Sequence, residues 1–346
     1  MTDNKIRLPA EWESQSAILI AWPHEQGDFG DQLDNVEETY QLIVNIIASK
    51  QKLIILCKNN SYQKHIEGLL QPSENIHFLH ISYNDIWVRD TAPLTILQNN
   101  EYYFLNFQFN GWGNKYPFQD DNAINSGLFN SGFFPSIKIK SIDFVLEGGS
   151  IDSDGKGTLL TTRQCLLNKN RNPKFSKNQI SQILKHKLGA KKILWLDQQA
   201  LEGDDTDAHI DTLARFCPKN IIVYSSCDNP DDIHYSQLKS MEEQLKSFTD
   251  TEEKPFVLLP LPLPGPIYNK SYQRLPANYC NFLITNQAVL LPVYDDPNDD
   301  FAYQQISSCF PGHEIIKIAC LSLIQQFGSL HCMTMQFPDK IFNPTA

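Results

Sequence analysis

The last of the eight cysteines, Cys332, follows His331 in the segment FGSLHCMTMQFP. A strand is predicted here because the run is apolar and lies between Gly328 and Pro338. A cysteine in such a run is most often a small buried hydrophobe. A thiol also becomes a nucleophile when a base or a positive charge lies beside it. In a strand His331 would point to the opposite face, so we interpret it as structural.

Two earlier segments carry the partners that such a thiol would need. DAHIDTLARF places His209 and Asp211 two residues apart, and NDIWVRDTAPLTI places Asp85, Trp87 and Asp90 at the edge of an apolar run. If DAHID is a strand, His209 and Asp211 point to the same side. A thiol, an imidazole and carboxylates are suited to nucleophilic attack on a cationic carbon.

Several of these residues also have a purely structural interpretation. Asp90 could pair with its neighbour Arg89 or cap a turn, and Trp87 could belong to the core. Glu147, in LEGG, could be a surface residue before a turn. The two glycines that follow it would allow close backbone approach or a sharp bend.

The segment GDDTDAHID combines four carboxylates with a histidine, so a metal site has to be considered. Oxygen-rich clusters suit magnesium or calcium, and histidine with acids suits iron or zinc. No second histidine occurs at ligand spacing and the chain has no CxxC pair, so we predict neither a metal nor a cofactor. Asp204, Asp205 and Asp207 could hold a substrate's distal cation or cap a turn, and the sequence does not separate the two.

Composition places the chain among soluble globular proteins, with 346 residues, 41% hydrophobic and 20% charged. The formal net charge of −11 argues against a nucleic-acid partner and would attract a cationic substrate. No apolar run has the length of a membrane span, and the amino-terminal segment lacks an apolar signal region. Scattered cysteines without paired spacing favour reduced thiols and hence a cytoplasmic location.

Strand-like runs alternate with helix-like stretches, which is typical of an α/β protein. The segment over residues 152–163 begins like a calcium-binding loop, but its twelfth position is Arg163 rather than glutamate. A hairpin turn is therefore predicted at Asp154-Gly155. A second hairpin is predicted at Asn286. These patterns alone indicate a doubly wound fold. The helix-like stretches are residues 31–50, 176–189, 232–249, 301–310 and 318–328.

The candidate functional segments recur along the chain at intervals of about sixty residues, with the last interval doubled. Such a period indicates radially repeated units. The segments are AWPH at 21–24, WVRD at 87–90, LEGG at 146–149, AHID at 208–211 and LHC at 330–332.

Seven segments, in order from about residue 8 to residue 338, resemble the agmatine deiminase and Porphyromonas-type peptidyl-arginine deiminase family of guanidine-modifying enzymes. The resemblance implies a single domain over residues 1–346, a five-bladed α/β-propeller (pentein) with pseudo-five-fold ββαβ repeats and a site on its axis. It also implies a homodimer. The segments are AWPHEQGDF, NDIWVRDTAPLTI, NGWGNKYPFQDDN, LEGGSIDSDGKGTLLTTRQCLLNKNRNP, LEGDDTDAHIDTLARF, PANYCNFLITNQAVLLPVYDD and GSLHCMTMQFP.

The resemblance implies hydrolysis of agmatine to N-carbamoylputrescine and ammonia. A guanidinium is planar and always charged, and carboxylates accept its paired N–H bonds. Cys332 would form a covalent thiouronium while His209 serves as acid and then base, and Asp90 and Asp211 would hold the guanidinium. The implied substrate-binding residues are Trp87, Glu147, Asp85, Asp205 and Asp207.

The chain departs from the family pattern in FGSLHCMTMQ and in TDAHIDT, where Ala208 stands at a position usually occupied by glycine. The departures leave the substrate open among agmatine, free arginine and peptidyl arginine. Free arginine would need a cation for its carboxylate, such as Arg89, Lys115 or Arg274. An amidinotransferase, a non-catalytic binder of cations and a metal-dependent hydrolase are the remaining alternatives.

Overall fold

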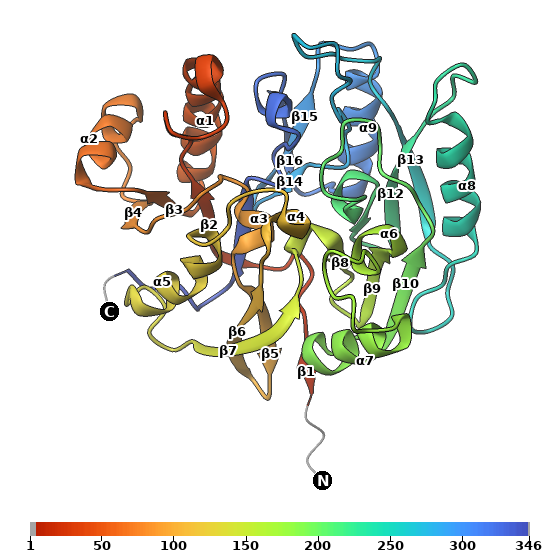
Figure 1. The fold of residues 1–346 in the computed structure, drawn as a ribbon, viewed down its shortest axis with the longest axis horizontal. Helices are drawn as coiled ribbons and strands as arrows, with labels where there is room; N and C mark the ends of the chain where they lie inside the picture. Colours follow the sequence, from red (N-terminus) through yellow and green to blue (C-terminus); the bar gives the residue numbers. More distant parts are fainter. Residues whose placement is uncertain (1–4, 345–346) are drawn as a thin grey trace.

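The computed structural model describes residues 5–344, and this part of the chain forms five separate sheets of three or four strands. The sheets succeed one another around the molecule in chain order (Figure 1). None of them is closed in the described range, and none is the continuous sheet of a doubly wound fold, so that prediction is wrong. The α/β class is confirmed.

Each sheet is listed here in spatial order. The first contains β1 (Ile6–Arg7), β5 (Leu94–Gln98), β6 (Glu101–Gln108) and β7 (Lys138–Val145). The others are β10 (Lys192–Leu196), β9 (Thr158–Thr162) and β8 (Ile151–Ser153); β11 (Ala214–Cys217), β12 (Ile221–Ser226) and β13 (Val257–Pro262); β14 (Leu283–Ile284), β15 (Ala288–Val293) and β16 (Glu314–Ala319); and β17 (Thr334–Pro338), β2 (Gln15–Ala21), β3 (Lys52–Cys57) and β4 (Ile76–His80).

One order of connection recurs in all five sheets of the described chain. An antiparallel pair of strands is followed by a helix and then by a strand parallel to the second, as in β11, β12, α8 and β13. The sheet that begins with β17 obeys the same order because β17 pairs with β2 near the other end of the chain. The connecting helices are α1 (Leu33–Ala48), α5 (Ile124–Asn130), α7 (Lys177–Leu188), α8 (Tyr235–Lys246) and α9 (Asp299–Cys309).

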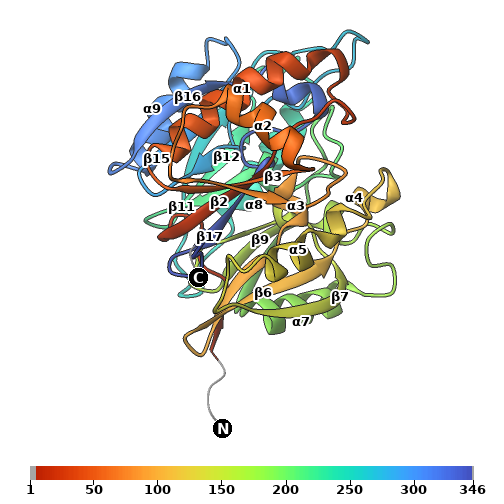
Figure 2. The same cartoon turned by 90° about the vertical axis from the view of Figure 1, so that its left-hand side faces the viewer.

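The helices follow the apolar spacing of their sequences. In α1 the buried residues Val36, Tyr40, Ile43 and Ile47 recur at helical spacing, and this face packs on β3 and β16. Figure 2 shows α1 and α2 (Asn60–Leu69) on the same side of the sheet that contains β3. Helices are confirmed within four of the five predicted stretches. The fifth, residues 318–328, is wrong, because it holds the end of β16 and a short 3₁₀ turn, η5 (Leu323–Gln326).

Both predicted hairpins are confirmed. Strands β8 and β9 pair antiparallel across Asp154-Gly155, and β14 and β15 pair antiparallel across Asn286. In the second hairpin the Asn286 amide donates to the carbonyl of Gln15, which ties the turn to the start of β2.

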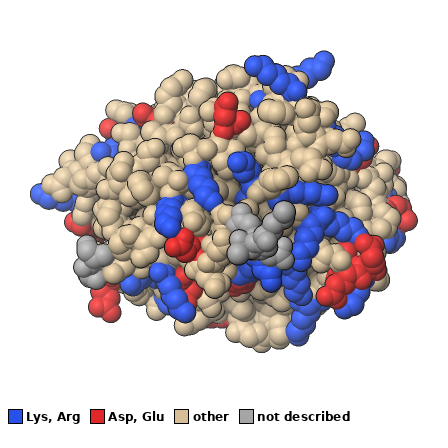
Figure 3. All heavy atoms as spheres, turned by 90° about the horizontal axis from the view of Figure 1, so that it is seen from below, with Lys and Arg blue, Asp and Glu red and all other residues tan. Residues whose placement is uncertain are grey.

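The net negative charge is unevenly distributed over the surface. Lysine and arginine side chains gather around the amino-terminal end on the face shown in Figure 3. A groove beside β1 and α7 is lined by Lys156, Lys185 and Lys191. Among residues 5–344, no helix combines the length and the apolar character that crossing a membrane would require.

Helix α7 supplies a test of the local structure. It begins with a capping box between Ser176 and Gln179 and ends at Gly189, where φ is +73° and an added Cβ would lie 2.0 Å from the carbonyl oxygen of Ile6. Gly132 has a similar φ of +79° but open space around it. By chemical denaturation we expect Gly132→Ala to cost about 1–2 kcal/mol of unfolding free energy. Gly189→Ala should cost roughly twice as much or more, because backbone must also move. Equal costs would contradict this account.

Candidate active site

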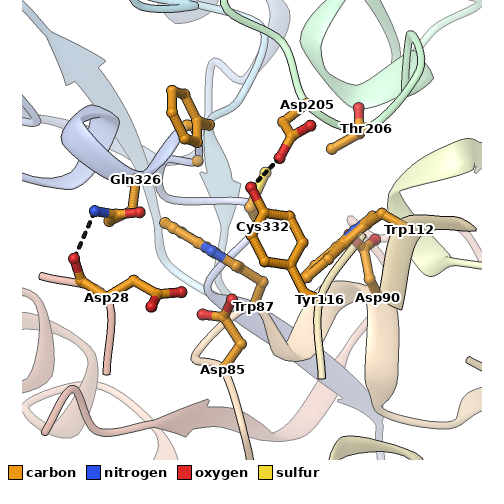
Figure 4. Close-up of a pocket in the computed structure, with 12 residues that line it drawn as sticks. Asp28, Asp85, Trp87, Asp90, Trp112, Tyr116, Asp205, Thr206, Gln326 and Cys332 are labelled. Atoms are coloured by element: carbon orange, nitrogen blue, oxygen red, sulfur yellow. Dashed lines mark hydrogen bonds between the residues drawn. The ribbon is translucent and has the colours of Figure 1, made fainter. Parts of the chain in front are cut away.

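A single pocket gathers side chains from segments far apart in the sequence (Figure 4). Four of its lining residues are aspartates, and none of the described residues that line it is a lysine or an arginine. Such a lining suits a cationic ligand with an apolar stem. The lining residues are Asp28, Asp85, Trp87, Asp90, Trp112, Tyr116, Asp205, Thr206, Gln326, Phe327, Gly328 and Cys332.

Short turns ahead of the strands, rather than the strands themselves, carry the chemistry. Asp90 lies in α3 (Val88–Thr91) before β5, and Gly149 in η3 (Gly148–Ser150) before β8. Asp211 lies in η4 (Ile210–Thr212) before β11, Asn281 precedes β14, and Cys332 precedes β17. Each sheet therefore contributes one segment at the same point of its connection order. Asn281 fills the doubled interval in the sequence.

Two local predictions are corrected by this arrangement. Cys332 lies in a turn over residues 330–333, and β17 begins only at Thr334. His209 is the N-cap residue of η4 rather than part of a strand. His209 and Asp211 thus reach the site through a helical turn, and strand alternation is not the reason.

Asn281 and Asp211 hold the thiol of Cys332. The Asn281 amide donates to Cys332 Sγ at 3.1 Å, and its carbonyl oxygen accepts from the Cys332 backbone N–H at 3.2 Å. Cys332 Sγ lies 3.7 Å from Asp211 Oδ2. Burial, together with Asp211 and Asp90, raises the pKa of Cys332 well above its usual value. The thiol is therefore uncharged until a cation enters between the carboxylates.

Asp90 is held by two donors and does not pair with Arg89. Its Oδ1 accepts from the backbone N–H of Gly149 at 2.8 Å, and its Oδ2 accepts from Trp112 Nε1 at 2.9 Å. Arg89 instead pairs with Glu11 at 3.1 Å, so the predicted alternative of an Asp90–Arg89 pair is wrong. Burial raises the pKa of Asp90 in spite of a nearby histidine.

His209 is buried, and neither ring nitrogen has a hydrogen-bond partner. Its Nδ1 lies 3.6 Å from Asp90 Oδ1. Burial alone would lower the pKa of His209, but Asp90, Cys165 and Glu147 together raise it well above the usual value. The ring is thus an imidazolium with N–H groups available for transfer.

Asp211 differs from Asp90 in its ionisation. Burial would raise the pKa of Asp211, but the hydrogen bond and charge of His331 lower it below the usual value. His331 Nδ1 lies 2.7 Å from Asp211 Oδ2, whereas Asp211 Oδ1 is buried without a partner. An unsatisfied buried acceptor of this kind is costly unless a ligand completes it.

Gly149 is the point on which three of these groups converge. A Cβ at this position would lie 2.8 Å from Asp211 Oδ2, 2.8 Å from His209 Nδ1 and 2.9 Å from Asp90 Oδ1. The close approach that the glycines of LEGG predicted is confirmed. Glu147, just before them, is not among the described lining residues; it is buried and pairs with Arg171 at 2.6 Å.

Three of the remaining predicted substrate-binding residues line the pocket. Trp87 and Asp85 line the pocket, and Trp87 packs so closely on Gly328 that a Cβ there would lie 2.5 Å from the ring. Burial and Asp121 raise the pKa of Asp85 to about 8. Asp205 lines the pocket and accepts from the Tyr116 hydroxyl.

The aspartates of the GDDTD segment have separate partners. Asp204 accepts from the backbone N–H of Ala208 at 2.7 Å and caps the turn. Asp207 pairs with Arg171 at 2.6 Å and does not line the pocket. Of the two functions left open for this segment, turn capping therefore describes Asp204, while Asp205 is the aspartate that lines the pocket.

The three cations considered for a substrate carboxylate are each paired with a carboxylate of the protein. Arg89 is buried against Glu11, Lys115 pairs with Asp205 at 3.1 Å, and Arg274 pairs with an aspartate at 2.9 Å. None of them lines the pocket. In the described structure the pocket therefore offers no free positive charge to an arginine carboxylate.

One group of buried side chains has the donor atoms for a metal ion. Among the described residues, Glu147, Cys165 and His209 bring one ligand atom each within 4.8 Å of one another, and all three are buried. This set could hold a borderline metal such as zinc. The aspartates of GDDTD do not take part in it, and the absence of a metal remains a prediction.

Comparison with known proteins assigns the family. Residues 7–338 match the sequence model of the Porphyromonas-type peptidyl-arginine deiminase family. The chain belongs to this family. Within it, a cysteine-to-serine variant of C. jejuni agmatine deiminase with substrate bound is 37% identical, with a TM-score of 0.90 and coverage of 97% of both chains.

Two further members of the Porphyromonas-type family illustrate its range. The agmatine deiminase of Pseudomonas savastanoi pv. phaseolicola is 30% identical over 96% of this chain and 95% of its own. A solved structure assigned as a candidate peptidyl-arginine deiminase is 41% identical, with a TM-score of 0.93, over 98% of this chain and all of its own. The family therefore includes members named for more than one guanidine substrate.

Several residues of the site were not singled out from the sequence. Asn281, Trp112 and Tyr116 contact the functional groups directly, and Asp28 lines the pocket. All four lie within segments that resemble the family. Chemistry alone gave no reason to select an asparagine or a tyrosine from them.

Gly149→Ala tests the convergence of the three groups. The methyl group would displace His209, Asp90 or Asp211. We therefore expect kcat/KM for ammonia release from agmatine to fall by at least about 100-fold while the protein stays folded. Gly68→Ala, in α2 with open space around it, is the matched control and should keep the original rate. A Gly149→Ala enzyme of normal activity would show that the groups do not act as a unit.

Proposed function

We propose that the protein is a cysteine-dependent guanidine iminohydrolase that converts agmatine and water to N-carbamoylputrescine and ammonia. The observation that carries the proposal is the placement of Cys332 Sγ 3.7 Å from one of two buried carboxylates, with an imidazolium beside the other. The relationship to agmatine deiminases over nearly the whole chain supports it.

Binding of the guanidinium starts the reaction. The flat cation enters between Asp90 and Asp211, and the unpaired Asp211 Oδ1 accepts one of its N–H groups. Burial and the two carboxylates hold the pKa of Cys332 high, and the positive charge offsets the carboxylates. The thiol therefore ionises when substrate is present, and its proton passes to solvent, where the released ammonia takes it up. The nucleophile is thus activated by the substrate that it attacks.

Covalent chemistry then proceeds in two halves. The thiolate of Cys332 adds to the guanidinium carbon, His209 donates a proton to one terminal nitrogen, and ammonia leaves a thiouronium on sulfur. His209, now neutral, takes a proton from water as the oxygen attacks the same carbon. The C–S bond breaks, the remaining O–H proton passes to the departing sulfur, and the neutral ureido product leaves as the thiol of Cys332 is restored.

The distal end of the pocket favours an amine over an amino acid. Trp87 offers an aromatic face to the methylene stem, and Asp85, Asp205 and the exposed Asp28 surround the position of the terminal ammonium. With no free cation in the lining, the carboxylate of free arginine would be repelled. We therefore place Asp85 and Asp205 at the distal ammonium, and Glu147 and Asp207 behind the site, where their pairs with Arg171 support His209 and its loop.

We also infer that the five sheets are the blades of one propeller in a single domain, because all share one order of connection and each sends one segment to the site. The homodimer and the cytoplasmic location remain predictions.

Cys332→Ser tests the nucleophile. We expect at least about a 1000-fold loss of ammonia release from agmatine, because an alcohol is far less ionised than a thiol at neutral pH. Binding of agmatine by calorimetry should persist. Cys57→Ser, at another buried cysteine, is the control and should retain turnover. Normal rates of ammonia release in Cys332→Ser would exclude the thiol mechanism. Ammonia release from arginine but not from agmatine would identify arginine as the substrate instead.

The pH dependence of KM tests the distal subsite. With a pKa of about 8, Asp85 is mostly neutral at pH 7 and becomes an anion as the pH rises, while the ammonium of agmatine stays charged. KM for agmatine should therefore fall by roughly tenfold between about pH 6.5 and pH 8.5, relative to KM for butylguanidine, which has no ammonium. In Asp85→Asn the two substrates should show the same dependence. If the KM values for agmatine and butylguanidine depend on pH in the same way in the unaltered enzyme, Asp85 does not bind the ammonium.

A further inference from the structure

A buried chain of hydrogen bonds leads from Glu11 to the nucleophile, and its first two members, Glu11 and His331, take no part in the steps above. His331 Nε2 lies 2.8 Å from Glu11 Oε1, and His331 Nδ1 lies 2.7 Å from Asp211 Oδ2. Asp211 Oδ2 in turn lies 3.7 Å from Cys332 Sγ. His331 is 1% exposed and does not line the pocket, so substrate cannot reach it.

We infer that His331 donates from both ring nitrogens, to Glu11 and to Asp211, and is the positioning residue that keeps Asp211 ionised beneath the substrate guanidinium. The inference rests on the proposed function, because it takes Asp211 as the guanidinium ligand. It gives a role to a residue that strand alternation had made merely structural. His331 acts through Asp211 and touches neither substrate nor the reacting atoms.

Hydrogen-bond geometry requires the charge. A neutral imidazole has one N–H and one lone pair, so one of the two carboxylates would face a lone pair at less than 3 Å unless it were protonated. Glu11 is an anion: burial would raise its pKa, but Arg215, Arg89 and His331 lower it well below the usual value. Glu11 is also paired with Arg89 and Arg215. A carboxylate oxygen within 2.8 Å of each ring nitrogen therefore assigns a proton to both nitrogens of His331.

Charge balance in the buried cluster agrees with this assignment. Arg89 donates to the carbonyl oxygen of His331 at 3.3 Å, and Arg215 lies 3.5 Å from Asp152. Burial raises the pKa of Asp152 to about 7, so it is partly ionised at neutral pH. If His331 were neutral, the carboxylates of Glu11, Asp211 and Asp152 would face only two cations, Arg89 and Arg215. An uncompensated charge is costly in a buried site. The charged groups in contact with His331 are Glu11, Arg89 and Asp211, and Arg215 and Asp152 lie beyond Glu11.

The charge matters because the two guanidinium ligands would otherwise compete. Asp90 Oδ1 and Asp211 Oδ2 each lie within 2.9 Å of the position that a Cβ on Gly149 would take, and two carboxylates so close tend to share a proton. The pKa of Asp90 is raised, whereas that of Asp211 is lowered, and His331 is the cation that Asp211 has and Asp90 lacks. Asp211 is therefore ionised before substrate arrives.

Ligand affinity as a function of pH tests the role. In a Cys332→Ser background, butylguanidine binding is measured by calorimetry between about pH 5.5 and pH 8.5. With His331→Gln we expect at least about a tenfold loss of affinity near pH 6, recovering as the pH rises and Asp211 ionises. His331→Lys, which keeps a cation, should restore the pH dependence of the parent. His234→Gln removes another buried histidine 2.9 Å from an aspartate and is the control for structural cost.

A loss of affinity in His331→Gln that is equal at every pH, or no loss, would overturn the inference and leave a structural role. A second measurement needs neither a variant nor a ligand. In protein labelled with ¹⁵N-histidine, both ring nitrogens of His331 should show imidazolium shifts and attached protons from about pH 6 to pH 8. A neutral tautomer in that range would also overturn it. Failure of the Cys332→Ser parent to bind butylguanidine would count against the proposed function alone, since the spectrum still decides the state of His331.

Discussion

The structure depends on keeping buried carboxylates charged beside a thiol. Asp90 and Asp211 are removed from water and lie against one glycine, and burial opposes the ionisation of both. His209 offsets Asp90 and His331 offsets Asp211. In the proposed mechanism a guanidinium adds a further positive charge between the carboxylates, and this charge activates Cys332.

The fold serves this constraint by bringing short turns together. Each sheet of the described chain contributes the segment that precedes its first strand, so five distant parts of the sequence meet at one point. Turns can present backbone N–H groups and side chains at close range, as Gly149 does for Asp90. The strands behind them are apolar and buried, as in β2 and β3, and provide the rigid support that a pre-organised site needs.

The sequence predicted more of this arrangement at the level of pattern than at the level of local geometry. The sixty-residue interval anticipated a repeated unit, and the glycines of LEGG anticipated close approach. The strand assigned to DAHID was wrong because Ile210–Thr212 forms a short 3₁₀ turn, which the backbone N–H of Leu213 closes by donating to the carbonyl of Ile210. The helix assigned to residues 318–328 was wrong because its first residues pair with β15. Contacts such as Asn281 with Cys332 link residues 51 apart, and no local pattern reports them.

The central claim is that Cys332 becomes covalently attached to the amidino carbon during turnover. The most direct test is mass spectrometry of enzyme quenched in acid while it is turning over agmatine, followed by peptide mapping. The account predicts a thiouronium adduct on the peptide that contains Cys332 and on no other cysteine peptide, with the mass of agmatine less ammonia. Steady ammonia release with no adduct on Cys332, under conditions that preserve thiouronium standards, would contradict it.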